Sequence, residues 1–293
     1  MKVFKRYILP LAVAVVLSGC SFAGEEPVQP VEEAVPTLQE VPVEEPIQPA
    51  GEGAAADPGP AVEPEPVPAY DFTQPAPERE AVDNTYFSDA AFVGDSRTDG
   101  FMIYSGIGTG KNLTSNGLSI FKLAEKKALT IGGEKYTLLE ALEMERYGKV
   151  YLCLGVNELG VYNDQGFYNA YLAAIDSIRA VQPDAVIYIQ GLIPLNEGEI
   201  AATSGSTYLT NEHLRVYNDL MRKAAQEKQV VYLDLYTEFV DENGELPPGA
   251  SRDGVHLRSD YCKRWLTYLQ THTVDPADLG LPQTEINEEG APL

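Results

Sequence analysis

The chain has 293 residues, a net charge of −23 at neutral pH, and only three cysteines and three histidines. No basic stripe interrupts this acidity, which excludes a nucleic-acid partner, because neutralising phosphates needs clustered Lys and Arg. The cysteines and histidines lack metal-ligand spacing, and Gly132-Gly133 lacks the Lys-Ser/Thr that would complete a phosphate loop. We therefore expect no metal and no cofactor.

The first 20 residues predict a lipoprotein signal peptide. Basic residues at positions 2–6 precede an apolar stretch of residues 8–17, which is shorter than the ~20 residues that span a bilayer. The stretch ends in Leu17-Ser18-Gly19-Cys20, which resembles the lipobox of bacterial lipoproteins, where cleavage precedes a cysteine that receives lipid such as palmitate. We expect a lipid anchor at Cys20 on the outer face of the bacterial cell membrane. The alternative is an ordinary secretory signal with an incidental cysteine.

Residues 21–83 hold 13 of the 21 prolines and a net charge of −14. Such a composition buries too little apolar surface to offset the entropy of ordering, so we predict a disordered acidic linker. Residues 84–275 carry the aromatic and β-branched runs of one folded domain. We expect residues 276–293 to form a flexible tail.

Strand-like runs alternate with helical patterns through this domain. The candidate strands are Ala90–Val93, Asn112–Ser115, Val150–Leu154, Val186–Ile189 and Val230–Leu233. Three of these five are near-continuous runs of Val, Ile, Leu and Tyr, as in parallel strands that are covered on both faces. Helical spacing predicts helices after Thr137, over 164–180, from about Thr210 and after Ser259. The alternation predicts a three-layer α/β/α domain with a parallel five-stranded sheet.

Two cysteines fall inside the predicted elements. Cys153 lies in a strand-like run and Cys262 in a helix-like one. Isolated cysteines in such positions are more often buried apolar side chains than partners in a disulfide, so we expect no disulfide between them.

Polar residues at the strand ends suggest acyl-transfer chemistry. That chemistry needs a hydroxyl nucleophile, a neutral imidazole to take its proton and a carboxylate to orient the imidazole. Ser96 follows a predicted strand at a small-residue turn, and Asp253 lies three residues before His256. Active sites of parallel sheets lie at the carboxyl ends of the strands, where these residues fall. Taken singly, each could be an ordinary turn, cap or loop residue.

Three sequence blocks together resemble the SGNH, or GDSL, hydrolase family over residues 88–272. Gly94-Asp95-Ser96 is similar to its first block, Gly155-Val156-Asn157-Glu158 to its Gly-x-Asn-Asp block, and Asp253-Gly254-Val255-His256 to its Asp-x-x-His block. The resemblance implies a flavodoxin-like sheet, Ser96 as nucleophile, His256 as base and Asp253 as its orienter. It also implies an oxyanion hole made by the Ser96 and Gly117 backbone N–H groups and the Asn157 side chain.

The chain departs from the family at two positions. Glu158 stands where the family usually has Asp, and Arg97 follows the serine where Leu is common. Arg97 could bind an anionic substrate group or pair with a nearby carboxylate, and we favour the pairing. His213 and His272 lack comparable neighbours in the sequence, so we assign both to the surface.

These patterns predict a lipid-anchored serine esterase or deacylase. By analogy with the family, its substrate would be an acyl ester, such as the O-acetyl group of a cell-envelope or exported polysaccharide. One alternative is a non-catalytic glycan-binding or scaffold lipoprotein with the same fold. Another is an acyltransferase that uses the same three residues.

Overall fold

The computed structural model describes residues 70–281, and these contain one parallel five-stranded sheet. Its strands are β1 (Ala90–Gly94), β2 (Lys111–Thr114), β5 (Lys149–Cys153), β6 (Val186–Gln190) and β7 (Val231–Leu233). Their order across the sheet is β2-β1-β5-β6-β7, and every neighbouring pair is parallel. Counted in sequence order, this is the flavodoxin-like arrangement 2-1-3-4-5. The predicted strands are confirmed, with ends that differ by at most one residue.

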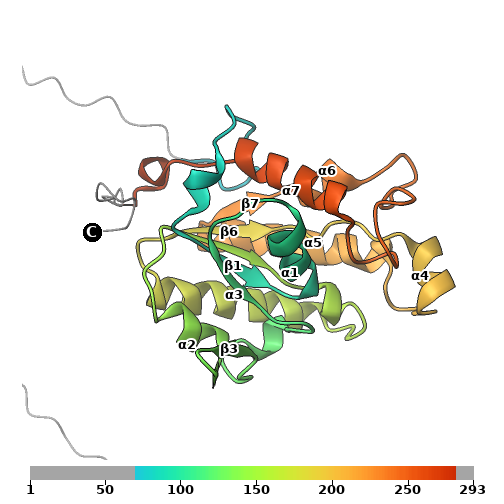
Figure 1. Cartoon of the computed structure of the whole chain (residues 1–293), viewed down its shortest axis with the longest axis horizontal. Helices are drawn as coiled ribbons and strands as arrows, with labels where there is room; N and C mark the ends of the chain where they lie inside the picture. Colours follow the sequence, from blue (N-terminus) through green and yellow to red (C-terminus); the bar gives the residue numbers. More distant parts are fainter. Residues whose placement is uncertain (1–69, 282–293) are drawn as a thin grey trace, which may run out of the picture. The chain divides into compact units, whose positions relative to one another are not determined.

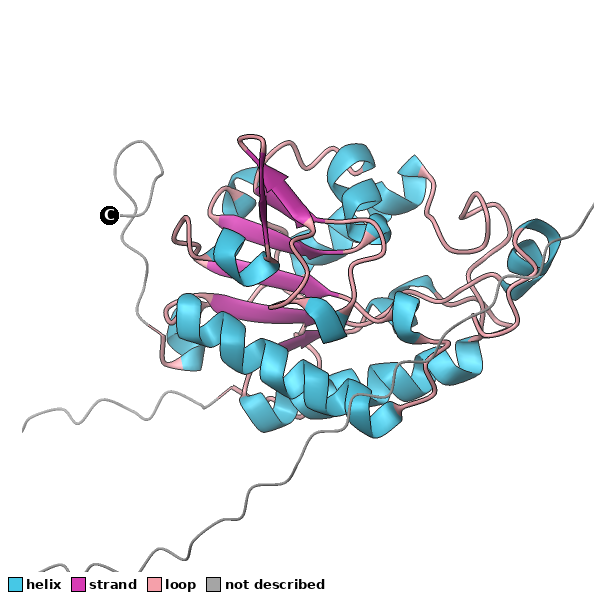
Figure 2. Cartoon of the chain, turned by 90° about the horizontal axis from the view of Figure 1, so that it is seen from below, coloured by secondary structure: helices cyan, strands magenta, loops and turns pink. Residues whose placement is uncertain are grey.

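Helices cover both faces of the sheet. Figure 1 shows α3 (Asp164–Val181) below the sheet and α7 (Ser259–Thr271) above it. The longest helices, α3 and α5 (Asn211–Lys228), pack against each other, and α1 (Ser96–Tyr104) packs against α7. In Figure 2 the strands lie side by side among these helices. The structure thus confirms the predicted three-layer α/β/α fold.

Alternation along the strands builds a core on each face of the sheet. In β1, Ala91 and Val93 join the core beneath α3 and α5, while Ala90 and Phe92 join the core beneath α1 and α7. All five residues of β1 are buried. A strand covered on both faces must be apolar at every position, which is why its sequence shows no polar alternation.

Several shorter elements complete the domain. The predicted helix after Thr137 is α2 (Leu138–Leu142), which opens with a Thr137–Glu140 capping box. Gly132-Gly133 forms the turn of an antiparallel hairpin, with positive φ at both glycines. The remaining elements are η1 (Asn84–Phe87), η2 (Ile120–Lys122), β3 (Leu129–Ile131), β4 (Glu134–Tyr136), η3 (Val156–Glu158), α4 (Glu197–Thr203), α6 (Leu235–Phe239) and η4 (Pro276–Leu279).

The structure differs from the sequence-based expectation at both edges of the domain. Residues 70–83, placed by composition in the linker, pack on the domain: Ala76 is buried and its N–H donates to the Tyr232 carbonyl at 2.9 Å. Arg79 pairs with Asp278, which joins this segment to η4. At the other edge, Leu279 packs on the core within the predicted tail. A few apolar side chains suffice for this docking, although the average composition is polar.

Cys153 and Cys262 are buried free thiols, as expected. No helix within residues 70–281 is long and apolar enough to cross a membrane. The predicted signal peptide, Cys20 and residues 21–69 of the predicted linker lie outside the described residues.

The docked segment leads to a stability prediction. A domain that begins at Asn84 should melt roughly 5–10 °C below one that begins at Tyr70, because burial of each lost apolar side chain contributes ~1–3 kcal/mol and ~1 kcal/mol shifts the melting temperature by ~2–4 °C at this size. Thermal unfolding followed by circular dichroism measures the difference. Arg79→Ala in the longer domain is the control and should shift it little, because the ion pair with Asp278 is largely exposed. Equal melting temperatures for the two domains would show that residues 70–83 add no stability.

Candidate active site

Ser96 lies at the turn between β1 and α1, at the carboxyl end of a central strand. Asp95 caps the helix, because its Oδ1 accepts the Arg97 N–H at 2.9 Å. Gly94 allows the turn to be this tight: a Cβ at its position would lie 2.0 Å from Thr98 Oγ1. The Gly-Asp-Ser block therefore has a local structural role in presenting Ser96 at the first turn of α1.

His256 and Asp253 lie on the loop that precedes α7. The Asp253 carboxylate accepts two backbone N–H groups through Oδ1, from Val255 at 3.0 Å and from His256 at 2.9 Å. Its Oδ2 lies 2.8 Å from His256 Nδ1. Partial burial favours the neutral acid, but the hydrogen bonds from His256 and Val255 outweigh it and lower the pKa of Asp253. This carboxyl group therefore stays ionised beside the imidazole.

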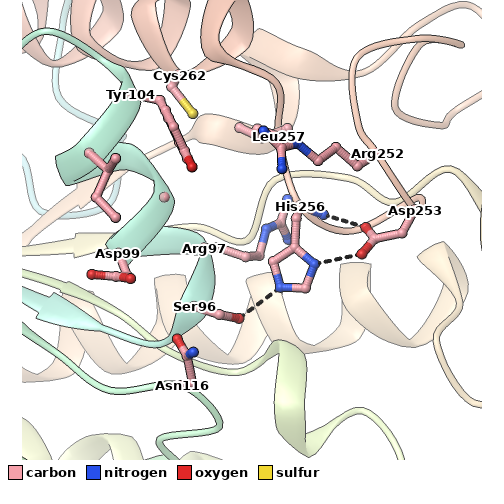
Figure 3. Close-up of a pocket in the computed structure, with 12 residues that line it drawn as sticks. Ser96, Arg97, Asp99, Tyr104, Asn116, Arg252, Asp253, His256, Leu257 and Cys262 are labelled. Carbon is pink, nitrogen blue, oxygen red and sulfur yellow. Dashed lines mark hydrogen bonds and ion pairs between the residues drawn. The ribbon is translucent and has the colours of Figure 1, made fainter.

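The three predicted residues form one chain of hydrogen bonds. Figure 3 shows the His256 ring between Ser96 and Asp253, with Ser96 Oγ 2.9 Å from His256 Nε2. Because the Asp253 carboxylate accepts the Nδ1 hydrogen, Nε2 is the unprotonated nitrogen and accepts the Ser96 hydroxyl proton. The side chains of His256 and Asp253 are 44% and 40% exposed, so the site opens to solvent.

Helix α4 holds the loop that carries His256. The Asn196 N–H donates to the Gly254 carbonyl oxygen at 3.0 Å, and the Thr203 hydroxyl donates to the Asp253 carbonyl at 3.2 Å. Glu199 accepts hydrogen bonds from the Ser251 hydroxyl and, at 3.1 Å, from the Gly249 N–H. Gly254 has φ +86°, and a Cβ there would lie 2.4 Å from the Asn196 carbonyl oxygen, so this close contact requires glycine. No helix is predicted from the sequence at α4, because Ile200 is its only buried residue and leaves no helical periodicity.

The predicted oxyanion donors lie near Ser96. The Ser96 N–H starts a helix and has no backbone acceptor among the described residues, as expected for the first N–H groups of a helix. Asn157 Nδ2 lies 3.1 Å from Asp95 Oδ2 and 3.2 Å from the Leu118 carbonyl oxygen. Gly117 follows Asn116, a pocket residue that Figure 3 shows beside Ser96. Its φ of +68° makes a left-handed turn there. Their oxyanion roles stay a prediction.

Three charged side chains are buried around this turn, namely Asp95, Glu158 and Arg97. Burial raises the pKa of Asp95, the N-cap residue that also holds Asn157. Burial also raises the pKa of Glu158, whose Oε1 accepts the Ile120 N–H at 2.8 Å. The longer glutamate side chain thus reaches the start of η2, which gives a local reason for this departure from the family block.

Arg97 does not make the carboxylate pairing that the sequence analysis favours. Its guanidinium is buried and donates to the backbone carbonyl oxygens of Ile193 at 2.9 Å and Pro194 at 3.5 Å. Among residues 70–281 it forms no ion pair within 4.0 Å. Arg97 therefore fastens the segment after β6 to the start of α1, and burial lowers the pKa of its guanidinium.

The two other histidines are partly buried rather than free on the surface. His213 lies between the Leu159 carbonyl at 2.8 Å and Asp164 at 2.9 Å, and its ring stacks on Tyr162. His272 contacts the Tyr268 carbonyl at the end of α7. Neither lines the pocket at Ser96, although His213 supports the loop that follows Asn157.

Ser96 and His256 open into a pocket of about 340 Å³ between α1 and the His256 loop. Apolar side chains line it together with charged and polar ones; the lining includes Arg97, Asp99, Ile103, Tyr104, Asn116, Arg252 and Leu257. In the described part of the chain, no group of three His, Cys, Asp or Glu side chains could hold a metal ion.

Comparison with known proteins gives fold relatives. A platelet activating factor assigned in Streptococcus pneumonia is 22% identical, with a TM-score of 0.51 over 65% of this chain and 84% of the other. A GDSL-like lipase from Bacteroides thetaiotaomicron VPI-5482 is 13% identical, with a TM-score of 0.45 over 62% and 86%. None of the curated proteins compared with the chain matches it.

The chain also matches the sequence model of one protein family. The model described as the GDSL-like Lipase/Acylhydrolase family matches residues 92–260, more than half of the 293-residue chain. The matched range begins in β1, just before Ser96, and ends just after His256, so it contains every residue of the hydrogen-bonded chain. This chain belongs to the GDSL-like lipase and acylhydrolase family and is a hydrolase of ester bonds.

Proposed function

We propose that the protein is a serine esterase that removes short acyl groups, O-acetyl groups above all, from a cell-envelope or exported carbohydrate. Ser96 is the nucleophile, His256 its general base and Asp253 the residue that orients the base. The observation that carries the proposal is the continuous hydrogen-bonded chain from Ser96 Oγ through His256 to Asp253, open to solvent in a pocket.

The geometry supports a two-step reaction. Nε2 of His256 accepts the Ser96 proton as Oγ attacks the ester carbonyl, and the ionised Asp253 stabilises the imidazolium that forms. The imidazolium then protonates the departing alkoxide, which leaves an acyl group on Ser96. A water molecule, deprotonated by His256, releases the acid and restores the serine hydroxyl.

The start of α1 suits the negative charge that develops on the carbonyl oxygen. The N-terminus of a helix carries partial positive charge, and the Ser96 N–H is available there. The Asn157 amide is held beside it by the buried Asp95 carboxylate. A substrate oxygen at this place would accept hydrogen bonds from the Ser96 N–H and from the Asn157 amide N–H, which now points toward Asp95. The Gly117 N–H would be the third donor.

Pocket chemistry supports a small acyl group on a polar alcohol. A channel for a long fatty acyl chain is mostly apolar, whereas this pocket includes Arg97, Asp99, Asn116 and Arg252. The predicted lipid anchor at Cys20 would place the domain outside the cytoplasmic membrane, where acylated polymers are largely glycans. The acetylated carbohydrate is therefore proposed from pocket polarity and predicted location together.

The first test concerns the triad. Ser96→Ala and His256→Ala should each nearly abolish hydrolysis of p-nitrophenyl acetate, and the double variant should be little worse, because the two residues act as one unit. Asp253→Asn should retain more activity, since it only loosens the imidazole. Activity of the native chain should fall on acidification, because a protonated imidazole cannot accept the serine proton. Initial rates and labelling with a fluorophosphonate probe measure these effects.

His272→Ala is the matched control for the triad variants and should keep the native rate. His213→Ala is less suitable, since His213 supports the loop after Asn157. A folded native protein that neither hydrolyses activated esters nor labels at Ser96 would refute the esterase and favour a glycan-binding role. Acyl groups found on an added sugar acceptor, in place of free acid, would instead identify an acyltransferase.

The second test concerns Asn157. Asn157→Ala should lower kcat by ~10²–10³-fold with little change in KM, because an oxyanion donor acts mainly in the transition state. Steady-state kinetics on p-nitrophenyl acetate separates the two constants. A raised KM with unchanged kcat would make Asn157 a ground-state binding residue.

The third test concerns the proposed anchor. Cys20→Ala should prevent lipidation, so that the precursor is not processed at the lipobox and incorporates no labelled palmitate in cells. Radiolabelling and detergent phase partition of the full chain measure this. Palmitate labelling that persists in Cys20→Ala would contradict the assignment of the lipid to this cysteine.

A further inference from the structure

Arg252 differs from the other arginines of the described chain. Each of the others between residues 70 and 281 donates a side-chain hydrogen bond to a carboxylate, a carbonyl or a tyrosine hydroxyl; they are Arg79, Arg97, Arg146, Arg179, Arg215, Arg222, Arg258 and Arg264. The Arg252 guanidinium has no such acceptor within those residues, and its only recorded partner is the face of the Tyr104 ring, with its central carbon 5.7 Å from the ring centroid. Five N–H donors are therefore free for a ligand.

This guanidinium lies at the catalytic pocket. Arg252 directly precedes Asp253, and both line the pocket that contains Ser96 and His256. Figure 3 shows Arg252 and Tyr104 on the side of His256 opposite Asn116. Tyr104 is 42% exposed on α1, so its ring is a platform that holds the guanidinium over the pocket by a cation–π contact. A substrate bound at Ser96 lies within reach of this pocket wall.

The carboxylates of the same pocket are occupied by other donors. Asp253 accepts from His256 and Val255, as described above. Asp99 Oδ1 accepts from the Asn112 amide at 3.0 Å and the Thr114 hydroxyl at 3.1 Å. An acidic domain offers many carboxylates, yet none of those in residues 70–281 pairs with this guanidinium. The pocket therefore presents a guanidinium that no carboxylate of the described residues pairs with directly, which suits an anionic group on the substrate.

We propose that Arg252 selects esters whose alcohol part carries a carboxylate or a phosphate near the acylated hydroxyl. The inference rests on the proposed esterase activity and specifies its substrate class. An acetyl group has no charge of its own, so the anion must belong to the alcohol part. Arg252 and its Tyr104 platform then form a specificity site beside the triad, and the substrate is an anionic acetylated carbohydrate or a similar anionic alcohol.

The test compares rigid acetyl esters that differ in charge. The substrates are 3- and 4-acetoxybenzoate, 4-acetoxyphenyl phosphate and the neutral 4-acetoxybenzamide. The rate at which hydroxide alone hydrolyses each ester is measured without enzyme and used to correct the enzymatic rate. The native chain should prefer at least one anion. Arg252→Gln should lower kcat/KM for that anion about tenfold and leave 4-acetoxybenzamide within about twofold, because the lost contact is one charge-assisted hydrogen-bond pair. Arg252→Lys should keep part of the preference, and added salt should reduce it.

Arg222→Gln is the matched control, since it removes the same charge from an exposed position on α5 outside this pocket. It should leave all rates unchanged. Preference for the phosphate over both benzoates would point to a phosphorylated alcohol, and the reverse to a carboxylate such as an acidic sugar. Equal loss on charged and neutral substrates in Arg252→Gln, or no anion preference in the native chain, would overturn the proposal. Hydrolysis of the neutral ester reports separately on the esterase activity itself.

Discussion

The hydrogen bond between Ser96 and His256 joins residues 160 positions apart, and the active site depends on it. Ser96 is fixed by a buried strand and by the tight Gly94 turn, which leaves it little freedom. His256 instead sits on a loop, where position must be imposed by neighbours. Helix α4 fixes this loop. Its N-cap Asn196 and its side chains Glu199 and Thr203 bind the loop on both sides of Asp253. A misplacement of about 1 Å in either element would break the hydrogen bond between the Ser96 hydroxyl and the His256 imidazole.

The site also contains charged side chains that are buried, and their desolvation costs free energy. Asp95 and Arg97 are buried within two residues of each other, on either side of Ser96. Neither is satisfied by an ion pair with the other; Asp95 accepts the Arg97 backbone N–H, while the guanidinium donates to Ile193 and Pro194. Such desolvated groups are tolerated when they are hydrogen-bonded. Here Asp95 links the turn after β1 to Asn157, which follows β5, and the Arg97 guanidinium links the same turn to the chain after β6. These hydrogen bonds hold the ends of the three strands in fixed positions relative to one another.

Much of the fold could be predicted from the sequence because the buried strands are unbroken apolar runs. The proximity of Ser96, Asp253 and His256 could be predicted equally well, since the motif blocks occur in order, and the structure brings these three side chains together. What could not be predicted depends on tertiary contacts. Helix α4 is short and has one buried residue, Ile200, so its sequence shows no helical periodicity. Helix α1 contains Gly100 and a single large buried apolar side chain, Phe101, which hides its helical pattern.

The docked ends of the domain show the same dependence on tertiary contacts. Averaged over residues 21–83, the composition is that of a solvated linker, yet the last part of it reaches the end of α7, where the Arg79 and Val82 N–H groups donate to the carbonyls of Thr271 and Gln270. Helix α7 begins three residues after His256 and has 13 residues, so its far end lies about 20 Å away along the axis. Arg79 also ties η4 to this place through Asp278. Both edges of the described domain are therefore fastened about a helix length from His256, by contacts that only the folded chain brings together.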